Sequence, residues 1–221
     1  MPVLSNSLKV IVLFLSVCCS AQSIFAAIHT VCDSGCDYTS IQLAHNNAIA
    51  GDSIDLQEPM HTEQGIVINR DISLVSSLEF GATLQAEPLA NMATDRVMLI
   101  SAGKTVFIEK LTIRHGKLTT ACGGGIFNEG ALTLNKVVLE KNISSFCGGG
   151  LYLSSSSSLV ATNSAFRHNS SVTQGGAIYS ESASAALIRN TVNSNTASQG
   201  GGIFNSGSGI LTITNSTFSA N

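Results

Sequence analysis

Four copies of a glycine-rich phrase contain the residues most able to do chemistry in this chain. Two copies begin with a cysteine, Cys122 and Cys147, and two with a glutamine, Gln174 and Gln199. A glycine run could cradle a phosphate, and a cysteine beside it could serve a redox reaction or form a disulfide. A nucleotide loop needs GKS, GKT or GxGxxG before a helix, and a redox cysteine needs CxxC or a cationic pocket. Neither a nucleotide-loop motif nor a redox-cysteine feature accompanies the four copies, which read CGGGIF, CGGGLY, QGGAIY and QGGGIF. We therefore expect their glycines and cysteines to have a structural role.

Carboxylates are the second group able to do chemistry, and ten of the fourteen precede residue 97. Glu129 and Glu181 occupy the same place within their copies of the phrase, and the copies are two repeats apart. Stacked strands would separate them by about 10 Å, too far to share a calcium ion. The distance lies near the upper limit of the roughly 6.5–9.5 Å of inverting glycosidases. We interpret both as solvated turn residues and expect no catalytic residue, no metal and no cofactor.

Three further sets of polar residues are expected to be solvated at the surface. Glu140 and Arg167 lie one repeat apart and could form an exposed ion pair worth at most about 1 kcal/mol. Arg114 and His115, in the phrase IRHG, are expected at a turn. Lys136 and Arg189 are expected in one column, without a matching group of acids.

The elements that position these residues are revealed by two independent repeats. The glycine-rich copies start at nearly equal intervals, and an asparagine recurs later in each unit at a similar interval. Alternating apolar and polar residues, rich in β-branched side chains, fill each unit and leave no room for a helix. A period of about 25–27 residues without helices predicts an all-β parallel β-helix. The recurring asparagines are Asn142, Asn169, Asn195 and Asn221.

Stacked coils place equivalent residues in columns about 4.8 Å apart. The glycines are expected at a bend, and the asparagines at another, because Asn tolerates the left-handed region and its amide can bond the next copy. We expect two inward apolar columns. They are Ile126, Leu151, Ile178 and Ile203, and Leu139, Phe166, Val192 and Phe218.

The segment 1–26 has the composition of a signal peptide. Lys9 gives a positive start, the stretch 10–17 is apolar but too short to span a membrane, and Ala26 offers a cleavage point. An uncleaved anchor and lipidation at Cys18 are alternatives. Export predicts a secreted, cell-surface or outer-membrane protein. The net charge of −3 argues against a nucleic-acid partner.

Four cysteines remain after this segment, which in an exported protein favours disulfides over metal. Cys122 and Cys147 share a column in adjacent coils, within the distance that a disulfide accepts. Cys32 and Cys36 could bond within a cap. No nearby set of ligands completes a zinc site.

The chain before the repeats divides into a cap and less regular coils. Residues 27–51 are expected to form an N-terminal cap with one short helix, begun by Thr39 or Ser40 and ended by Gly51. That helix would cover the first coil and protect a strand edge. Residues 52–221 are expected to form the β-helix, which stops within a repeat as though truncated. We expect it to continue into, or pair with, further β-helix at that edge.

Two phrases carry a resemblance to known families. GGAI (175–178) with FRHN (166–169) resembles the GGAI and FxxN repeats of polymorphic outer membrane proteins, whereas LEKN and VNSN lack the aromatic residue. The opening from residue 35 is similar to secreted pectate-lyase-like β-helix proteins. The resemblance implies a right-handed β-helix and a non-enzymatic adhesion or cell-envelope role, with a host-surface protein or glycan as partner. The alternative is a carbohydrate-active β-helix enzyme, a lyase or glycoside hydrolase, or a fragment of one.

Overall fold

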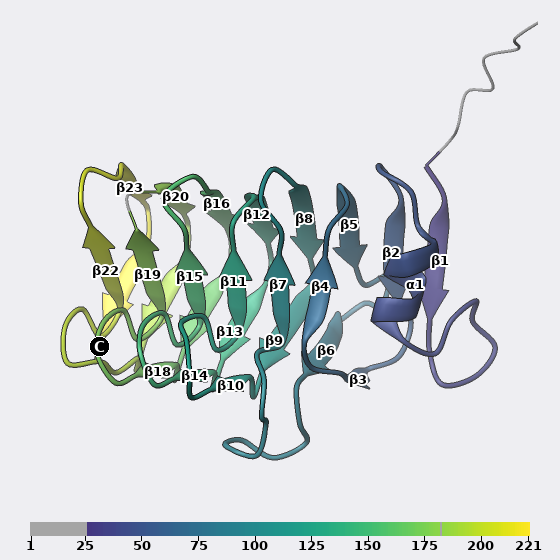
Figure 1. Ribbon diagram of the computed structural model, residues 1–221, viewed down its shortest axis with the longest axis horizontal. Coiled ribbons are helices and arrows are strands. Elements are labelled where there is room, and N and C mark those ends of the chain that lie inside the picture. The colour runs from purple at the N-terminus through teal and green to yellow at the C-terminus, as the bar shows by residue number, and fades with distance from the viewer. Residues whose placement is uncertain (1–25, 182) are drawn as a thin grey trace, which may run out of the picture.

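The chain forms a parallel β-solenoid of about seven turns with very little helix, which confirms the predicted fold class (Figure 1). The computed structural model describes residues 26–181 and 183–221. The predicted signal peptide therefore lies outside the described residues, apart from Ala26. A complete turn contributes one strand to each of three parallel sheets, so neighbouring strands in a sheet come from successive turns.

The first sheet shows why these segments become strands. In Ala131–Asn135, Leu132 and Leu134 are buried, whereas Thr133 and the two end residues are partly exposed. This two-residue alternation is that of a strand with one face on a core. In spatial order the first sheet consists of β1 (Ile28–Val31), β2 (Ser53–Leu56), β5 (Ile72–Val75), β8 (Thr105–Glu109), β12 (Ala131–Asn135), β16 (Ser158–Thr162), β20 (Ser184–Ile188) and β23 (Leu211–Thr214).

The second sheet contains one of the predicted inward columns. Leu139, Phe166, Val192 and Phe218 are in register on successive strands, and the first three are buried. The sheet consists of β3 (Met60–Thr62), β6 (Ala82–Gln85), β9 (Leu111–Arg114), β13 (Val138–Glu140), β17 (Ala165–Arg167), β21 (Thr191–Asn193) and β24 (Thr217–Ser219).

The third sheet contains the other predicted column. Ile126, Leu151, Ile178 and Ile203 are in register, and the first three are buried. The sheet consists of β4 (Ile66–Ile68), β7 (Met98–Ile100), β11 (Ile126–Asn128), β15 (Leu151–Leu153), β19 (Ile178–Glu181) and β22 (Ile203–Ser206). A short sheet between the second and third consists of β10 (Lys117–Leu118), β14 (Ile143–Ser144) and β18 (Ser170–Ser171).

Residues with left-handed backbone form the two corners of the second sheet. The sequence predicted that the recurring asparagines would adopt this conformation, and that prediction is wrong. The left-handed residue directly precedes each asparagine, because the corner residue projects outward while the asparagine points into the coil. The corner after the first sheet, which we call the first corner, consists of Lys110, Lys136, Asn163, Arg189 and Asn215, with φ of 49–56°. The second corner consists of His115, Lys141, His168, Ser194 and Ala220, with φ of 52–63°.

The single helix of the described chain, α1 (Ile41–Asn47), begins where the sequence predicted but ends earlier. Ser40 is the N-cap, and its side-chain oxygen accepts a hydrogen bond from the backbone N–H of Leu43. Its C-cap is Ala48 rather than a residue near Gly51, whose φ of +95° places it in a separate turn.

The helix covers the edge of the third sheet at β4. The Gln42 side chain accepts a hydrogen bond from the Val67 N–H at 2.7 Å and donates one to the Val67 carbonyl oxygen at 3.3 Å. The buried His45 accepts one from the Asn69 N–H at 3.2 Å through its Nε2 atom. Backbone groups that an exposed edge would offer to another strand are thereby satisfied.

Candidate functional site

Both predicted disulfides are present. Cys122 and Cys147 join successive turns with a Cα–Cα distance of 4.6 Å. Cys32 and Cys36 close a short loop after β1 with a Cα–Cα distance of 5.5 Å. All four cysteines in the described chain are therefore bonded, and none is free to act as a nucleophile.

The glycine run after Cys122 is pressed against neighbouring backbone. A Cβ atom on Gly124 would lie 2.1 Å from the Ile143 carbonyl oxygen, so no other residue fits there without a backbone shift. The N–H groups of Gly123 and Gly124 donate to carbonyl oxygens of the next turn at 2.9 and 3.2 Å. These donors are already used, and an anion has no cradle of free N–H groups here.

The recurring asparagines form a hydrogen-bonded ladder inside the solenoid. The Asn142 side-chain amide donates to the Asn169 Oδ1 atom at 3.1 Å, and Asn169 donates in the same way to Asn195 at 3.1 Å. The backbone N–H of Asn169 also donates to the Asn195 Oδ1 atom at 2.9 Å. The second amide hydrogen of Asn169 bonds the Leu139 carbonyl oxygen at 2.8 Å. Asn195 continues the ladder to Asn221 at 2.9 Å, so these side chains serve the stack rather than a ligand.

The two carboxylates considered for catalysis do not face each other across one site. The strand register places Glu129 and Glu181 two turns apart with Ser154 between them. Glu181 accepts a hydrogen bond from the Tyr152 hydroxyl group. Burial, together with this bond and the Glu181 charge, raises the pKa of Tyr152 above its usual value.

An aromatic column on the outer face of the third sheet was missed by the sequence analysis. Phe127, Tyr152, Tyr179 and Phe204 are stacked with ring centroids 4.6, 5.5 and 5.6 Å apart. The Arg96 guanidinium lies 4.6 Å from the centroid of the first ring. The signal was available, because an aromatic residue follows the inward apolar residue in all four copies of the phrase.

The ion pair predicted between Glu140 and Arg167 is present, but it is not an exposed pair. The Arg167 Nε atom lies 2.8 Å from a Glu140 carboxylate oxygen, and Glu140 is only 8% exposed. The Arg114 guanidinium lies 3.9 Å from the other oxygen and donates two hydrogen bonds to the Gln85 side chain. Adjacent turns cover the carboxylate, which the spacing of the repeats alone did not indicate.

His115 corrects a second expectation, because its side chain is buried rather than solvated. It is 6% exposed, and its Nδ1 atom lies 2.9 Å from the Glu87 carbonyl oxygen. Glu87 is the second residue of the loop of residues 86–97, which is slightly longer than the equivalent connections in later turns. That loop lies over His115, and the repeats gave no indication of it.

Lys136 and Arg189 occupy one column, as predicted, in the first corner. Among residues 26–181 and 183–221, no group of three His, Cys, Asp or Glu side chains is placed to hold a metal ion. No helix in the same part of the chain is long and apolar enough to cross a membrane.

The arrangement of three parallel sheets around one apolar interior defines the class of a parallel β-helix protein. Residues 63–218 match the family model described as the right handed beta helix region. The chain therefore belongs to the right-handed β-helix family. Searches of curated proteins and of solved structures found no match to it.

Proposed function

We propose that the chain is an exported, non-enzymatic β-helix protein whose outer faces serve adhesion or contact with a cell envelope. One observation carries this proposal: the repeats use their reactive side chains within the solenoid. Cys122 is bonded to Cys147, Asn169 lies in the ladder, and Glu140 is held between two arginines. The outer faces of the stacked strands form an extended surface, and such a surface suits binding to a partner.

The predicted signal peptide and the resemblance to polymorphic outer membrane protein repeats support a secreted or surface location. A host-surface protein or glycan is the proposed partner class.

The first test is an adhesion assay on the protein as it is exported. The full chain is expressed with its own signal segment (1–26), the mature N-terminus is sequenced, and purified protein is immobilised for attachment of host cells or envelope fragments. We expect cleavage near Ala26 and saturable attachment. Retention in the cytoplasm without attachment would contradict the proposal.

The second test addresses the enzyme alternative. Turnover of polygalacturonate and neutral β-glycans is measured with and without calcium. We expect none above a boiled control. Turnover that disappears in Glu129→Gln or Glu181→Gln would replace the proposal with a carbohydrate-active enzyme.

A further inference from the structure

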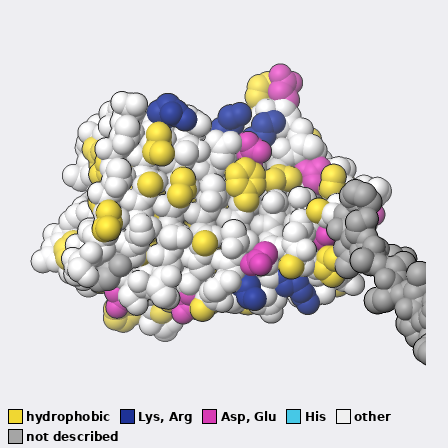
Figure 2. Space-filling view, turned by 90° about the horizontal axis from the view of Figure 1, so that it is seen from above, with side chains coloured by type: hydrophobic (Ala, Val, Ile, Leu, Met, Phe, Trp, Pro, Cys, Tyr) yellow, Lys and Arg dark blue, Asp and Glu magenta, His cyan; other side chains and the backbone are white. Residues whose placement is uncertain are grey.

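More than half of the chain's Lys and Arg residues lie on the second sheet or at its corners, although the protein as a whole is acidic. Three occupy the first corner, one occupies the second, and two point outward from the strands between them. Figure 2 shows Lys and Arg side chains gathered along the edge from which an adjoining hydrophobic and acidic pair projects. Figure 2 shows an acidic side chain beside them as well. We call the outer face of the second sheet, with its two corners, the basic face, and its cations are Lys110, Arg114, Lys136, Lys141, Arg167 and Arg189.

Few carboxylates neutralise the basic face. Glu140 is buried between Arg114 and Arg167, so one acid serves two cations. Glu79 is exposed at the opposite end of the first corner from Arg189. Glu109 directly precedes Lys110 and accepts a hydrogen bond from the Asn135 side-chain amide at 2.6 Å, so three carboxylates stand against six cations. The charge excess is therefore local and faces solvent, where it can attract a polyanion.

The cations of the first corner are held in a row by backbone bonds to the next turn. The N–H groups of Lys110 and Lys136 donate to carbonyl oxygens there, each at 3.1 Å, and that of Arg189 donates at 2.9 Å. Successive turns are about 4.8 Å apart, so the row spans four turns with one interruption, at Asn163.

The corner does not require cations for its conformation. Asn163 and Asn215 occupy the same column with φ of 51° and 49°. Asparagine is also favoured over lysine or arginine in the left-handed region. Three cations at positions where asparagine suffices therefore point to a role outside the solenoid.

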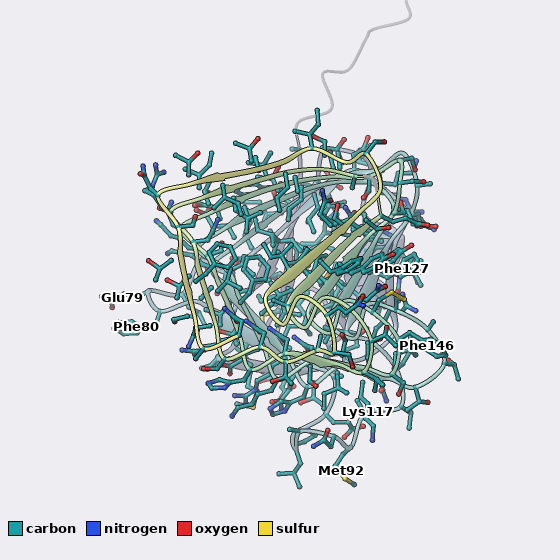
Figure 3. The ribbon with its side chains drawn as sticks, turned by 90° about the vertical axis from the view of Figure 1, so that its left-hand side faces the viewer. Glu79, Phe80, Met92, Lys117, Phe127 and Phe146 are labelled. Carbon is teal, nitrogen blue, oxygen red and sulfur yellow. A yellow bond between two sulfur atoms is a disulfide. The ribbon has the colours of Figure 1, made fainter. Side chains whose placement is uncertain are left out.

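A cleft with an exposed aromatic ring lies at one end of this row. Residues 76–81 connect β5 to β6 and project beside the second sheet, with Glu79 and Phe80 at the tip (Figure 3). The side chain of Phe80 is 94% exposed. It lines a cleft together with Glu79, Lys110, Thr112 and Lys136, so two cations and one carboxylate border the cleft. The Lys110 ammonium group donates to the Leu78 carbonyl oxygen at 3.4 Å, which ties the loop to the corner.

We propose that the basic face binds a linear anionic polysaccharide bearing carboxylate or sulfate groups. The inference rests on the proposed function and names a ligand class for it. Sugar residues of an extended chain follow one another at an interval similar to the spacing of the turns, so successive acidic groups meet successive corner residues. The Phe80 ring stacks on the apolar face of one sugar in the cleft.

A nucleic acid fits the basic face less well. Single strands are bound by several aromatic rings that stack successive bases, and duplex DNA is read by an element that enters a groove. The basic face offers one exposed ring at its end and a flat sheet. A polysaccharide requires only the row of charges and that single stacking contact.

The test compares variants that keep the corner conformation. Lys110→Asn, Lys136→Asn and Arg189→Asn are combined, because asparagine already occupies this column at Asn163 and Asn215. The probes are heparin, polygalacturonate, neutral dextran and DNA, titrated at salt from about 50 to about 200 mM. We expect wild-type protein to bind heparin, polygalacturonate or both, with a loss of about tenfold or more in the triple variant and a shallower salt dependence.

Two further variants complete the design. Lys104→Asn removes one cation from a turn before β8, outside the basic face, and should leave affinity unchanged. Phe80→Ala should weaken binding without changing the salt dependence, because it removes stacking and no charge. Thermal unfolding and circular dichroism confirm that each variant is folded.

Binding of heparin alone or of polygalacturonate alone supports the inference and shows whether the basic face prefers sulfate or carboxylate groups. Unchanged binding by the folded triple variant would overturn it, as would equal binding of dextran or tighter binding of DNA. Cell attachment without any binding to the two anionic glycans would defeat this inference and leave the proposed function standing.

Discussion

The turns after residue 116 and the turns before it follow the same backbone path with different kinds of residues. The later turns repeat the same glycines and asparagines in register. The earlier turns use single contacts that do not recur, such as the Asp55 carboxylate accepting from the Ser77 N–H at 2.8 Å. Another is the Asp71 carboxylate accepting from the Thr105 N–H at 2.8 Å. A β-helix therefore needs hydrogen-bond partners for the backbone groups at its bends, and sequence repetition is only one way to supply them.

The two regions also differ in what they present to solvent. The loops of residues 76–81 and 86–97 both project from the earlier turns (Figure 1, Figure 3). The connections between the first and second sheets in the later turns are short, such as residues 136–137 and 163–164. The loop of residues 76–81, which makes the same connection in an earlier turn, has no counterpart among the repeats.

The largest difference in stability between the two regions is expected when one glycine in each region is replaced by alanine. Gly124→Ala in the later turns places a methyl group 2.1 Å from the Ile143 carbonyl oxygen, and we expect a loss of about 5 kcal/mol or failure to fold. Gly103→Ala in the earlier turns meets no atom within 4 Å and has φ of +71°, so we expect a loss of about 1 kcal/mol. Urea unfolding measures both, and equal losses would contradict the comparison.

The next effect concerns the ladder. Asn169→Ala leaves the Asn142 backbone N–H, the Asn142 amide and the Leu139 carbonyl oxygen without their buried partner. We expect a loss of about 4 kcal/mol in the free energy of unfolding. The control is the half-buried Asn193→Ala, whose amide makes one long hydrogen bond, 3.4 Å to the Ser194 hydroxyl oxygen, and which should cost less than about 0.5 kcal/mol. If Asn169→Ala were as stable as Asn193→Ala, water would have replaced the Asn169 amide in the ladder, and the comparison would be contradicted.

The disulfides provide a smaller contrast. Cys122 and Cys147 are 25 residues apart, and Cys32 and Cys36 are 4 apart. Loop entropy predicts that replacing the first pair by serine costs about 3.5 kcal/mol and replacing the second pair costs about 2 kcal/mol. Denaturant unfolding of the two double variants measures the difference, and thiol titration of the exported wild type should find no free thiol among these four.

The smallest effect is a pH response confined to the earlier turns. Burial lowers the pKa of His45 and of His61. Below the usual histidine pKa of about 6.5, the unfolded chain takes up protons that the folded chain does not. The contribution of these histidines to the free energy of unfolding is therefore complete above that pH and is lost as the pH drops towards their lower folded-state pKa values. Hydrogen exchange, corrected for its intrinsic pH dependence, should show lost protection in α1 and β4 between about pH 7 and about pH 5.5, and none in β12 and β16.

Variants separate this response from general acid sensitivity. His45→Gln should reduce the loss of protection, whereas replacing the exposed His168 should not. Uniform loss across both regions would contradict the assignment to buried histidines.

The repeats made the fold, the apolar columns and the Cys122–Cys147 bond predictable, because spacing alone assigns residues to columns. Spacing does not say how deeply a column is covered, so Glu140 and His115 were wrongly placed in solvent. It also does not say which of two adjacent residues turns the corner, so the left-handed conformation was assigned to the asparagines. The Phe80 cleft arises from a loop with no counterpart in the repeats, and no periodic pattern could indicate it.

The bond between Cys122 and Cys147 also has a mechanical consequence. A solenoid pulled along its axis unravels turn by turn, because each strand is held only by its neighbours. The bond joins two successive turns, so the chain between the two cysteines bears no load while the bond is intact. Those 25 residues would otherwise add about 85 Å of extended length. Under tension the protein therefore has a shorter maximum extension, and this covalent link between turns removes far more length than the Cys32–Cys36 bond does.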